Sequence, residues 1–340
     1  MSESRGQQTP SRGGLSVLIT GAGGYVGRLV VQQLAGVLAT AEGRERLGKV
    51  VATDIRPVPA AVQLPGVHYE EVDVRDPTLA ERLGHHRVDA VVHLAAVVTP
   101  PKGATREWLH SVDVLGTQNV LQCVREAGVG KVIVTSSGAA YGYHRDNPDW
   151  LEESHPLRGN PEIPYADHKR QVEEMLARWR EEHPEIEQLI LRPGTVLGAD
   201  CVNQITALFD GRFVIGLRGT DTPFVLIWDR DVAEIIVRGL LDEKAGIYNL
   251  AGDGAVPMRE LAAMMGKPFV ALPPSLVGAA LGLLQRLGLS DYGPEQVAFL
   301  RYRPVLKNER LKRDFPYTPR KNSREVFAHF LEARHRGARP

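Results

Sequence analysis

Short apolar stretches alternate with amphipathic stretches along most of the chain. Runs rich in β-branched and other apolar residues predict strands at Leu15–Thr20, Val50–Asp54, Val67–Val72, Val88–Leu94, Lys131–Ser136, Gln188–Arg192 and Ile247–Ala251. Between them, apolar residues recur at helical spacing over Gly24–Leu38, Pro77–Gly84, Thr105–Gly128, Pro164–Glu182 and Asp229–Asp242. Several strands are apolar throughout, which is typical of a parallel sheet with helices on both faces. The pattern predicts a doubly wound α/β fold.

The alternation breaks down in two regions. Residues 138–163 form a long connection with three prolines and three glycines, and irregular loops of this length usually have a function. Residues 253–340 have no strand–helix rhythm, and we expect them to form a smaller C-terminal substrate lobe together with residues 196–227. The main domain then comprises residues 14–195 and 228–252. The polar residues 1–13 are expected to be a disordered tail.

Composition argues against several classes of protein. The 340 residues are enough for about two domains, and 41 basic residues balance 41 acidic ones, which argues against a dedicated nucleic-acid binder. Two cysteines cannot form a disulfide framework, and no cluster has the spacing of metal ligands. The longest apolar run, Leu276–Leu284, is about half a membrane span, and the N-terminus has no apolar signal segment. We therefore expect a cytoplasmic protein with no metal and no nucleic-acid or membrane partner.

Basic residues gather near the C-terminus. Residues 301–324 contain nine lysines and arginines, against only Glu309 and Asp314. Two interpretations remain open, because these side chains could form a solvated face or the anion-contacting edge of a substrate pocket.

Three glycines, Gly21, Gly24 and Gly27, directly follow the first predicted strand and open the first predicted helix. The first permits a tight turn, the second lets the backbone approach a pyrophosphate at the positive helix N-terminus, and the third allows close helix–strand packing. Because a strand precedes the glycines and a helix follows them, the pattern predicts dinucleotide binding by a Rossmann-type sheet.

The second predicted strand ends in Asp54, followed by Ile55 and Arg56. A carboxylate here can accept hydrogen bonds from the ribose hydroxyls of NAD and repels the 2′-phosphate of NADP, whereas a nearby arginine can accommodate that phosphate. We take the carboxylate as the stronger determinant, so the expected cofactor is NAD. Asp73, after the third predicted strand, is expected near the adenine edge.

The fourth predicted helix carries a pair of side chains suited to proton transfer. Tyr165 and Lys169 are four residues apart and therefore share a helix face. Tyrosine, with a pKa of ~10, is a poor base at neutral pH, but a neighbouring ammonium group favours the phenolate and should lower its pKa. Ser136 and Ser137 end the strand that enters the long loop, at the edge where open α/β sheets bind ligands.

These motifs together resemble those of a known family. At familiar separations, the chain contains the glycine pattern, Asp54, His93-Leu-Ala-Ala96, Gly116-Thr-Gln-Asn-Val120, Ser136-Ser137, Tyr165-x-x-x-Lys169 and Leu191-Arg-Pro-Gly-Thr-Val-Leu-Gly198. Over residues 14–252 it resembles an extended short-chain dehydrogenase/reductase of the NAD-dependent epimerase/dehydratase family. Beyond residue 252 the similarity is limited to length and to the late basic, proline-containing segment.

The resemblance implies a role for each motif. Tyr165 is the expected catalytic acid/base, Lys169 its electrostatic partner and a ribose ligand, and Ser137 the hydroxyl that bonds the reacting oxygen. Ser136 is the neighbouring alternative, and only one of two adjacent strand residues can face the site. The implied cofactor-binding residues are Gly21, Gly24, Tyr25, Val26, Gly27, Asp54, Ile55, Arg56, Asp73, Val74, Leu94, Ala95, Ala96, Tyr165, Lys169 and Pro193.

The resemblance also implies a type of reaction. It favours an epimerase-like oxidoreductase, a homodimer that transfers hydride at a secondary alcohol of a nucleotide-linked sugar. Relatives that dehydrate sugars have carboxylates just after the strand serine, where this chain has Gly138 and Ala139. A dehydrogenase or reductase of a sugar or another secondary alcohol is the alternative, and a non-catalytic dinucleotide sensor is a third hypothesis. Asp113 stands where many relatives have an asparagine, so the resemblance assigns it no role.

Overall fold

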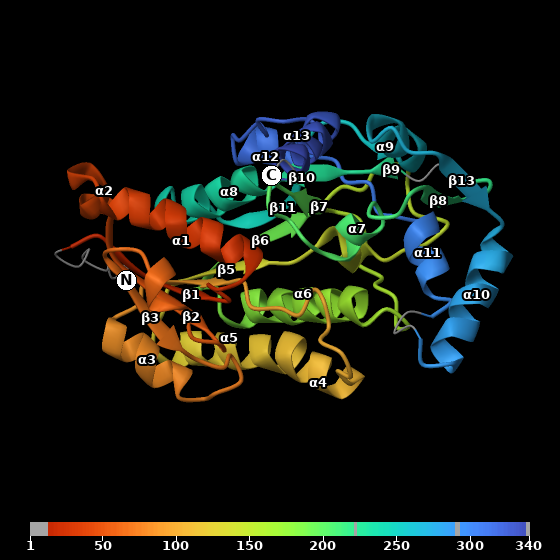
Figure 1. Cartoon of the computed structure of the whole chain (residues 1–340). Coiled ribbons are helices and arrows are strands. Elements are labelled where there is room, and N and C mark those ends of the chain that lie inside the picture. Colours follow the sequence, from red (N-terminus) through yellow and green to blue (C-terminus); the bar gives the residue numbers. More distant parts are fainter. Residues whose placement is uncertain (1–12, 221–222, 290–292, 338–340) are drawn as a thin grey trace.

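A parallel sheet forms the centre of the molecule (Figure 1). The computed structural model describes residues 13–220, 223–289 and 293–337, so residues 1–12 of the expected tail lie outside the described residues. The sheet consists of β1 (Leu15–Thr20), β2 (Leu47–Asp54), β3 (Val67–Glu71), β4 (Ala90–His93), β5 (Lys131–Thr135), β6 (Glu187–Pro193) and β11 (Gly246–Leu250). The seven strands run parallel in the order β11-β6-β5-β4-β1-β2-β3. The predicted Rossmann-type, doubly wound sheet is confirmed.

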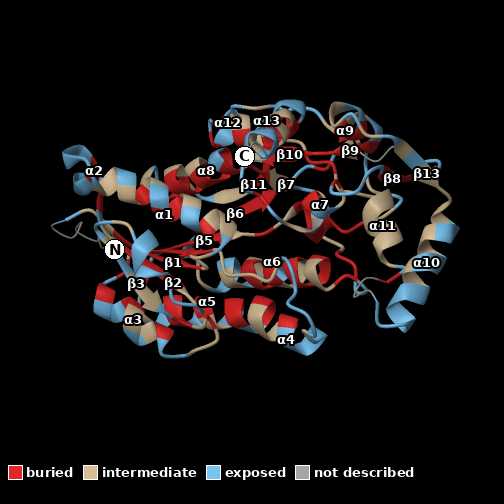
Figure 2. Ribbon diagram, in the orientation of Figure 1, coloured by how far each residue is buried: buried red, intermediate tan, exposed pale blue. Residues whose placement is uncertain are grey.

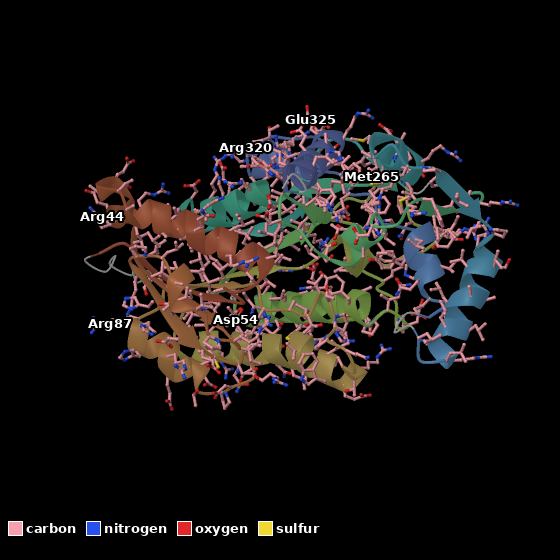
Figure 3. The ribbon with its side chains drawn as sticks, viewed as in Figure 1. Arg44, Asp54, Arg87, Met265, Arg320 and Glu325 are labelled. Atoms are coloured by element: carbon pink, nitrogen blue, oxygen red, sulfur yellow. The ribbon has the colours of Figure 1, made fainter. Side chains whose placement is uncertain are left out.

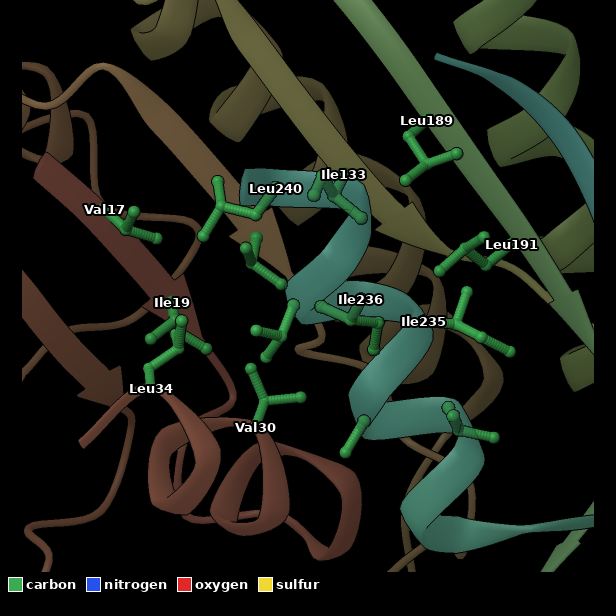
Figure 4. Packing of buried hydrophobic residues seen from close by; sticks show 14 of the residues in the cluster. Val17, Ile19, Val30, Leu34, Ile133, Leu189, Leu191, Ile235, Ile236 and Leu240 are labelled. Carbon is green, nitrogen blue, oxygen red and sulfur yellow. The ribbon is translucent and has the colours of Figure 1, made fainter. Parts of the chain in front are cut away.

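Helices cover both faces of the sheet because each helix has one apolar face. One face carries α1 (Tyr25–Leu38), α8 (Asp229–Leu241) and α12 (Glu309–Asp314), and the other carries α3 (Leu79–His86), α5 (Gly116–Glu126) and α6 (Pro164–Glu182). In α1 the buried residues Gly27, Val30, Val31 and Leu34 recur at i, i+3, i+4 and i+7. Figure 4 shows α1 and α8 packing their aliphatic side chains against the strands. Figure 2 shows the same layering, with the buried residues concentrated along the strands.

The predicted helix over Thr105–Gly128 is interrupted. The chain forms α4 (Arg106–His110), a π-helical turn η2 (Ser111–Leu115) and then α5. The extra residue of a π turn directs the carboxylate of Asp113 toward the loop after β4, where it accepts a hydrogen bond from the Val97 N–H at 2.8 Å. Short elements elsewhere in the main domain are α2 (Ala41–Arg46) and the 3₁₀ turns η1 (Ala60–Val62) and η3 (Gly138–Tyr141).

Smaller elements lie beside the sheet, above and to the right in Figure 1. They are β7 (Thr195–Leu197), α7 (Gln204–Ala207), β8 (Val214–Leu217), β9 (Pro223–Phe224), β10 (Leu226–Trp228), β12 (Val256–Pro257), α9 (Met258–Met264), β13 (Phe269–Leu272), α10 (Pro274–Arg286), α11 (Gln296–Arg301) and α13 (Ser323–Gly337). Phe209, Phe224, Leu261 and Phe327 belong to their shared core. Helix α12 instead packs in the core of the sheet, so the chain returns to the main domain before α13. The exact domain boundaries stay a prediction. None of the described helices is long and apolar enough to span a membrane.

Candidate active site

The three glycines of the first loop have different surroundings. Gly21 has a φ of +68°, and a Cβ there would lie 2.7 Å from the Ala95 nitrogen, so the loops after β1 and β4 touch. A Cβ at Gly27 would lie 2.1 Å from the Gly21 carbonyl oxygen. At Gly24, which caps α1, that same oxygen is the only atom within 4 Å of a Cβ, at 3.1 Å. Two of the glycines are therefore required by packing, whereas the third leaves open space before the helix N-terminus. This cradle fits the pyrophosphate of a dinucleotide.

Asp54 closes the cradle at the end of β2 (labelled in Figure 3). Its Oδ2 accepts a hydrogen bond from the Gly23 N–H at 3.0 Å, and its Oδ1 accepts one from the Arg56 N–H at 3.2 Å. The carboxylate thus lies directly beside the glycine loop. This is where the ribose of the adenosine half would lie if the pyrophosphate occupies the cradle.

The position of Asp54 predicts a preference for NAD over NADP. A 2′-phosphate beside this carboxylate adds a like charge at close range, which should weaken NADP binding by at least about tenfold relative to NAD. Replacing Asp54 with asparagine should narrow that difference, because the repulsion disappears while the side-chain size is kept. Calorimetric titration of both nucleotides against both proteins measures it. Equal affinities in the wild type would mean that Arg56 outweighs the carboxylate.

Several expected cofactor residues direct their side chains elsewhere. The Val74 side chain is buried in the core, and its carbonyl accepts a hydrogen bond from Asn119 at 2.8 Å. The Tyr25 hydroxyl donates to Asp229 at 2.5 Å, and burial raises the pKa of this tyrosine. Asp73 forms an ion pair with Arg75 at 2.6 Å. Side-chain contacts of Val74 and Tyr25 with a cofactor are therefore not supported, and only their backbone groups remain candidates.

Five further expected cofactor residues lie at the carboxyl ends of the strands. Leu94, Ala95 and Ala96 directly follow β4, Ile55 is exposed after β2, and Pro193 is the last residue of β6. The strand order reverses between β1 and β4, and open α/β sheets bind ligands at such a reversal. The structure therefore brings these residues to the edge of the sheet that carries the glycine loop.

Tyr165, Lys169 and Ser137 meet at this same edge. The Lys169 Nζ lies 5.8 Å from the centroid of the Tyr165 ring and donates a hydrogen bond to the Thr135 carbonyl at 2.8 Å. The Ser137 side chain lies close enough to the Tyr165 hydroxyl to influence its pKa, and its hydroxyl oxygen accepts a hydrogen bond from the Ala139 N–H at 3.1 Å. The end of β5 and the first turns of α6 thus assemble the three predicted catalytic side chains in one place.

The predicted lowering of the pKa of Tyr165 is not found in this structure. Burial raises the pKa of Tyr165 to about 12, and the Ser137 side chain opposes this only in part. Burial also lowers the pKa of Lys169, which is the charge expected to act on the phenol. Desolvation therefore outweighs the electrostatic attraction assumed from sequence. At neutral pH Tyr165 holds its proton and is ready to donate it.

The structure also decides between the two neighbouring serines. The Ser136 hydroxyl is buried and donates to the carboxylate of Glu173, which lies two turns further along α6 than Tyr165, at 2.5 Å. Glu173 forms a buried ion pair with Arg192 at 2.6 Å. Ser136 therefore belongs to a polar network beneath the site, and Ser137 is the hydroxyl that faces Tyr165.

This buried network anchors the long connection over residues 138–163. Arg192 donates to the Tyr141 hydroxyl at 2.8 Å and to the Glu153 carbonyl at 3.1 Å. The Tyr141 hydroxyl donates in turn to Asn249 Oδ1 at 2.9 Å. Strands β6 and β11 thus both hold the loop through hydrogen bonds, and the loop carrying Ser137 is fixed against the sheet.

A second buried pair, which the motifs did not identify, lies next to Lys169. Asp113 contacts His168 Nδ1 at 3.0 Å, and both side chains are buried. Because Asp113 also accepts from the Val97 N–H, it ties the loop after β4 to α6. The one available signal was the departure from asparagine at this position. Among the described residues, His168 Nε2 has no hydrogen-bond partner.

His93 is a structural residue beneath the cofactor loops. The Thr117 hydroxyl donates to the Asp113 carbonyl, so it accepts from His93 Nε2 at 3.0 Å, and His93 Nδ1 then accepts from Thr20 at 2.8 Å. Complete burial, reinforced by the charge of Lys169, lowers the pKa of His93 from 6.5 to about 3. The imidazole is neutral and bridges β1, β4 and α5.

His93 should make the protein sensitive to mild acid. The unfolded chain binds a proton near pH 6.5 and the folded one only near pH 3. The contribution of neutral His93 to the free energy of unfolding is therefore complete above pH 6.5. It is lost as the pH falls toward 3, by up to about 1.4 kcal/mol per pH unit. Urea unfolding across this range should show a shallower pH dependence for His93→Gln, whereas the exposed control His85→Gln should match the wild type. An unchanged dependence in His93→Gln would contradict the assignment.

Arg303 is the functional candidate that the sequence motifs missed. Its guanidinium lies 4.1 Å from the ring centroid of Phe224 and 4.7 Å from that of Phe299. It donates one hydrogen bond, to the Thr195 hydroxyl at 2.9 Å, while its Nη1 is buried without a partner among the described residues. Burial lowers its pKa to about 10. A half-buried cation with no facing carboxylate among the described residues favours an anionic ligand.

The rest of the basic segment behaves differently from Arg303. Five of its other basic residues form ion pairs: Lys307 with Glu152, Lys312 with Asp253, Arg313 with Asp314, Arg320 with Glu234 and Arg324 with Glu260. These pairs lie on the surface, as the solvated-face interpretation expects. Phe299 links Arg303 to the site, because it packs edge-on against Tyr143 at 5.1 Å in the apolar cluster that also contacts Tyr165.

Comparison with known proteins agrees with this arrangement. Residues 17–219 match the NAD dependent epimerase/dehydratase family. The chain is 24% identical over 321 residues to an uncharacterized protein of Mycobacterium bovis, covering 94% of this chain and 84% of that one. It is 32% identical over 182 residues to the N-acetyl-alpha-D-glucosaminyl-diphospho-ditrans,octacis-undecaprenol 4-epimerase of Escherichia coli O157:H7, covering 52% of this chain and 53% of the relative.

Solved structures show the same fold. The UDP-glucose 4-epimerase of Thermus thermophilus in complex with NAD superimposes with a TM-score of 0.69 at 23% identity, covering 95% of this chain and all of that one. The dTDP-glucose 4,6-dehydratase of Bacillus anthracis in complex with NAD gives a TM-score of 0.71 at 15% identity, covering 95% of this chain and 97% of that one.

The fold and the site thus define a nucleotide-dependent enzyme built on a Rossmann-type sheet. The chain belongs to the NAD dependent epimerase/dehydratase family. It is an enzyme of this family, and its cofactor is NAD.

Proposed function

We propose that the protein epimerises a secondary alcohol of a nucleotide-linked sugar by reversible hydride transfer. The observation that carries this proposal is that Ser137, Tyr165 and Lys169 converge at the edge of the sheet that holds the glycine loop. Arg303, whose Nη1 has no partner among the described residues, lies beside the neighbouring apolar cluster. Proton transfer and anion binding are thereby available at one site.

The chain's own residues supply the proton chemistry. NAD, when bound, supplies the hydride acceptor and donor. Tyr165 must first lose its own proton to solvent, and the phenolate then accepts the substrate hydroxyl proton as the substrate carbon loses hydride. Ser137 orients the substrate oxygen by a hydrogen bond. Return of the hydride to the opposite face of the ketone, with return of the proton from Tyr165, inverts that carbon. Lys169 stabilises the phenolate and is suited to bind the cofactor ribose.

Arg303 supports a phosphorylated substrate. Its unpartnered Nη1 and the absence of a facing carboxylate among its described contacts suit a diphosphate oxygen. The names of two relatives, a UDP-glucose 4-epimerase and a diphospho-undecaprenol sugar 4-epimerase, describe sugars linked through a diphosphate. We assign the same class of substrate to this chain.

The loop after β5 argues against dehydration. Elimination of water needs an acid and a base beside the sugar, and the positions after Ser137 are Gly138 and Ala139. A Cβ at Gly138 would lie 2.9 Å from the end of the Leu306 side chain, so a larger residue here would require Leu306 to shift. Epimerisation and simple oxidation need only the proton carrier that Tyr165 provides.

A cofactor and turnover assay separates the epimerase from a dehydrogenase. Nucleotide released from denatured protein should be NAD, retained through purification. Protein without added cofactor should then interconvert UDP-glucose and UDP-galactose, or another pair in a panel of UDP- and dTDP-sugars. Net NADH formation that requires added NAD would identify a dehydrogenase instead, and no turnover with any diphosphate sugar would refute the substrate class.

Arg303 provides a test of the anion site. Arg303→Met should raise KM by about tenfold or more with a smaller effect on kcat, because a charge-assisted bond to the substrate phosphate is lost. Lys307→Met is the matched control, since Lys307 lies four residues away in a surface ion pair with Glu152. An unchanged KM in the Arg303 variant would remove Arg303 from the substrate site.

A further inference from the structure

Helix α10 and the turn after it expose a stripe of leucines. Leu276, Leu283, Leu284, Leu287 and Leu289 are 55%, 59%, 40%, 61% and 71% exposed. The spacing from Leu276 to Leu283 and Leu287 is i, i+7 and i+11, which places these residues along one helix face. No residue of α10 is buried. Figure 2 shows α10 as exposed or partly exposed along its whole length, at the end of the molecule farthest from β3.

The opposite face of α10 is the one that packs. A Cβ at Gly278 would lie 3.5 Å from Val297, and one at Gly282 would lie 3.3 Å from Pro294. The glycines therefore let α10 approach α11 and the residues just before it, and the leucines are not needed for that contact. Because Phe299 of α11 belongs to the cluster around Tyr165, α10 lies one helix away from the candidate active site.

The surroundings of this stripe are basic. Residues 211–219 and 266–289, which contain β8, β13 and α10, include Arg212, Arg218, Lys267 and Arg286 but no aspartate or glutamate. The three arginines are exposed. Lys267 is engaged in hydrogen bonds to two backbone carbonyls. Two acidic residues border these ranges: Asp210, which pairs with Arg334, and Glu295, which lies beside Gln285 of α10. The segments that contain and adjoin the stripe therefore carry a net positive charge.

We propose that α10 is an interfacial helix that docks the protein on an anionic phospholipid bilayer. Its 13 residues are about 20 Å long, which is too short to span the hydrocarbon core but is suited to lying in the interface. The leucines would enter the acyl boundary, and the arginines would meet the phosphate headgroups. This inference goes beyond the proposed reaction and does not depend on it.

Charge favours a bilayer over a second copy of the chain. A two-fold contact through α10 would bring two copies of the same net positive segment close together, which adds like-charge repulsion. Anionic headgroups instead complement them. The sequence expectation of no membrane partner considered only spanning segments, and a helix lying on a surface satisfies a different length requirement.

Vesicle flotation of the full chain tests the proposal. Binding to phosphatidylcholine vesicles with about 30% phosphatidylglycerol should be at least about tenfold stronger than to phosphatidylcholine alone. The double variant Leu283→Glu, Leu287→Glu should bind at least about tenfold more weakly, because it places charges on the helix face that would enter the bilayer. Val62→Glu is the control, because Val62 is equally exposed, at 62%, but lies between β2 and β3. Unchanged NAD affinity in all variants verifies folding.

Three results would overturn the proposal. The first is the absence of vesicle binding by the wild type, and the second is undiminished binding by the double variant. The third is self-association, measured by sedimentation, that the double variant abolishes while vesicles capture neither protein. That last outcome would mean that a second copy covers α10.

Discussion

Replacing Tyr165 with phenylalanine is expected to lower turnover by about 10²- to 10⁴-fold, the usual contribution of a general acid/base. The ring remains in place, so its packing in the cluster with Tyr143 and Phe299 is kept and only the proton-carrying oxygen is lost. Affinity for NAD should stay nearly unchanged. Calorimetry and turnover measured on one preparation separate the two effects.

Tyr69→Phe is the matched control for this experiment. The Tyr69 hydroxyl accepts a hydrogen bond from the Leu64 N–H at 3.1 Å, beside β3 and away from the site, so its loss should leave turnover unchanged. A Tyr165→Phe variant that keeps more than about a tenth of normal activity would exclude Tyr165 as the acid/base. Lys169→Met should weaken both NAD binding and turnover.

The pH profile distinguishes the two roles proposed for Lys169. Burial holds the pKa of Tyr165 at about 12, so alcohol oxidation should speed up as the pH rises and the phenol loses its proton. Ketone reduction needs the protonated phenol and should slow down over the same range. Removing the positive charge in Lys169→Met should shift this pH dependence of the rates to higher pH. An unchanged pH profile in Lys169→Met would mean that Lys169 acts on the cofactor and not on Tyr165.

Replacing Glu173 with glutamine is expected to destabilise the fold by about 3–5 kcal/mol. The substitution leaves the Arg192 guanidinium buried without its counter-charge and weakens the acceptor of the Ser136 hydroxyl. The cost is large because a buried charge that loses its partner cannot be solvated. The free energy of unfolding in urea, followed by circular dichroism, measures it.

The neighbouring residue supplies the control. Glu174 pairs with Arg170 at 2.6 Å on the same helix, but this pair is partly exposed, and Glu174→Gln should cost less than about 1 kcal/mol. Adding Arg192→Met to Glu173→Gln should recover part of the lost stability, since the uncompensated charge is then removed. Equal effects of the two glutamine variants would show that burial of the Glu173 pair has no energetic consequence.

The sheet could be predicted because its signals are local. Each strand is an apolar run bounded by turn or helix residues, and parallel strands covered on both faces require that pattern. The π turn at η2 could not be predicted. It depends on Asp113 reaching Val97 and His168, which are 16 and 55 residues away in the chain.

The candidate site likewise contains features that local sequence predicts and features that depend on distant residues. Gly21, Gly27, Tyr165 and Lys169 are recognisable because helix and turn geometry fixes the spacing that they need. The resemblance favoured Ser137 over its neighbour Ser136, and only the structure shows that the Ser136 hydroxyl is engaged by Glu173 on another element. The pKa of Tyr165 was predicted in the wrong direction. The spacing of Tyr165 and Lys169 indicates a nearby positive charge, but it does not indicate the desolvation that the surrounding cluster imposes.

By itself, the sequence determined the strands and helices of the main domain, the glycine-rich loop, the shared helix face of Tyr165 and Lys169, and the family resemblance. Each of these rests on residues close together in the chain, where backbone geometry sets the interaction. Only the tertiary structure decided that Arg303 stacks on Phe299, beside the cluster that includes Tyr165, with its Nη1 buried and unpartnered among the described residues, while several of its basic neighbours form surface ion pairs. It also decided that the leucines of α10 face outward. Burial is a property of the assembled fold, since it depends on which distant segments pack against a side chain, and local patterns do not carry it.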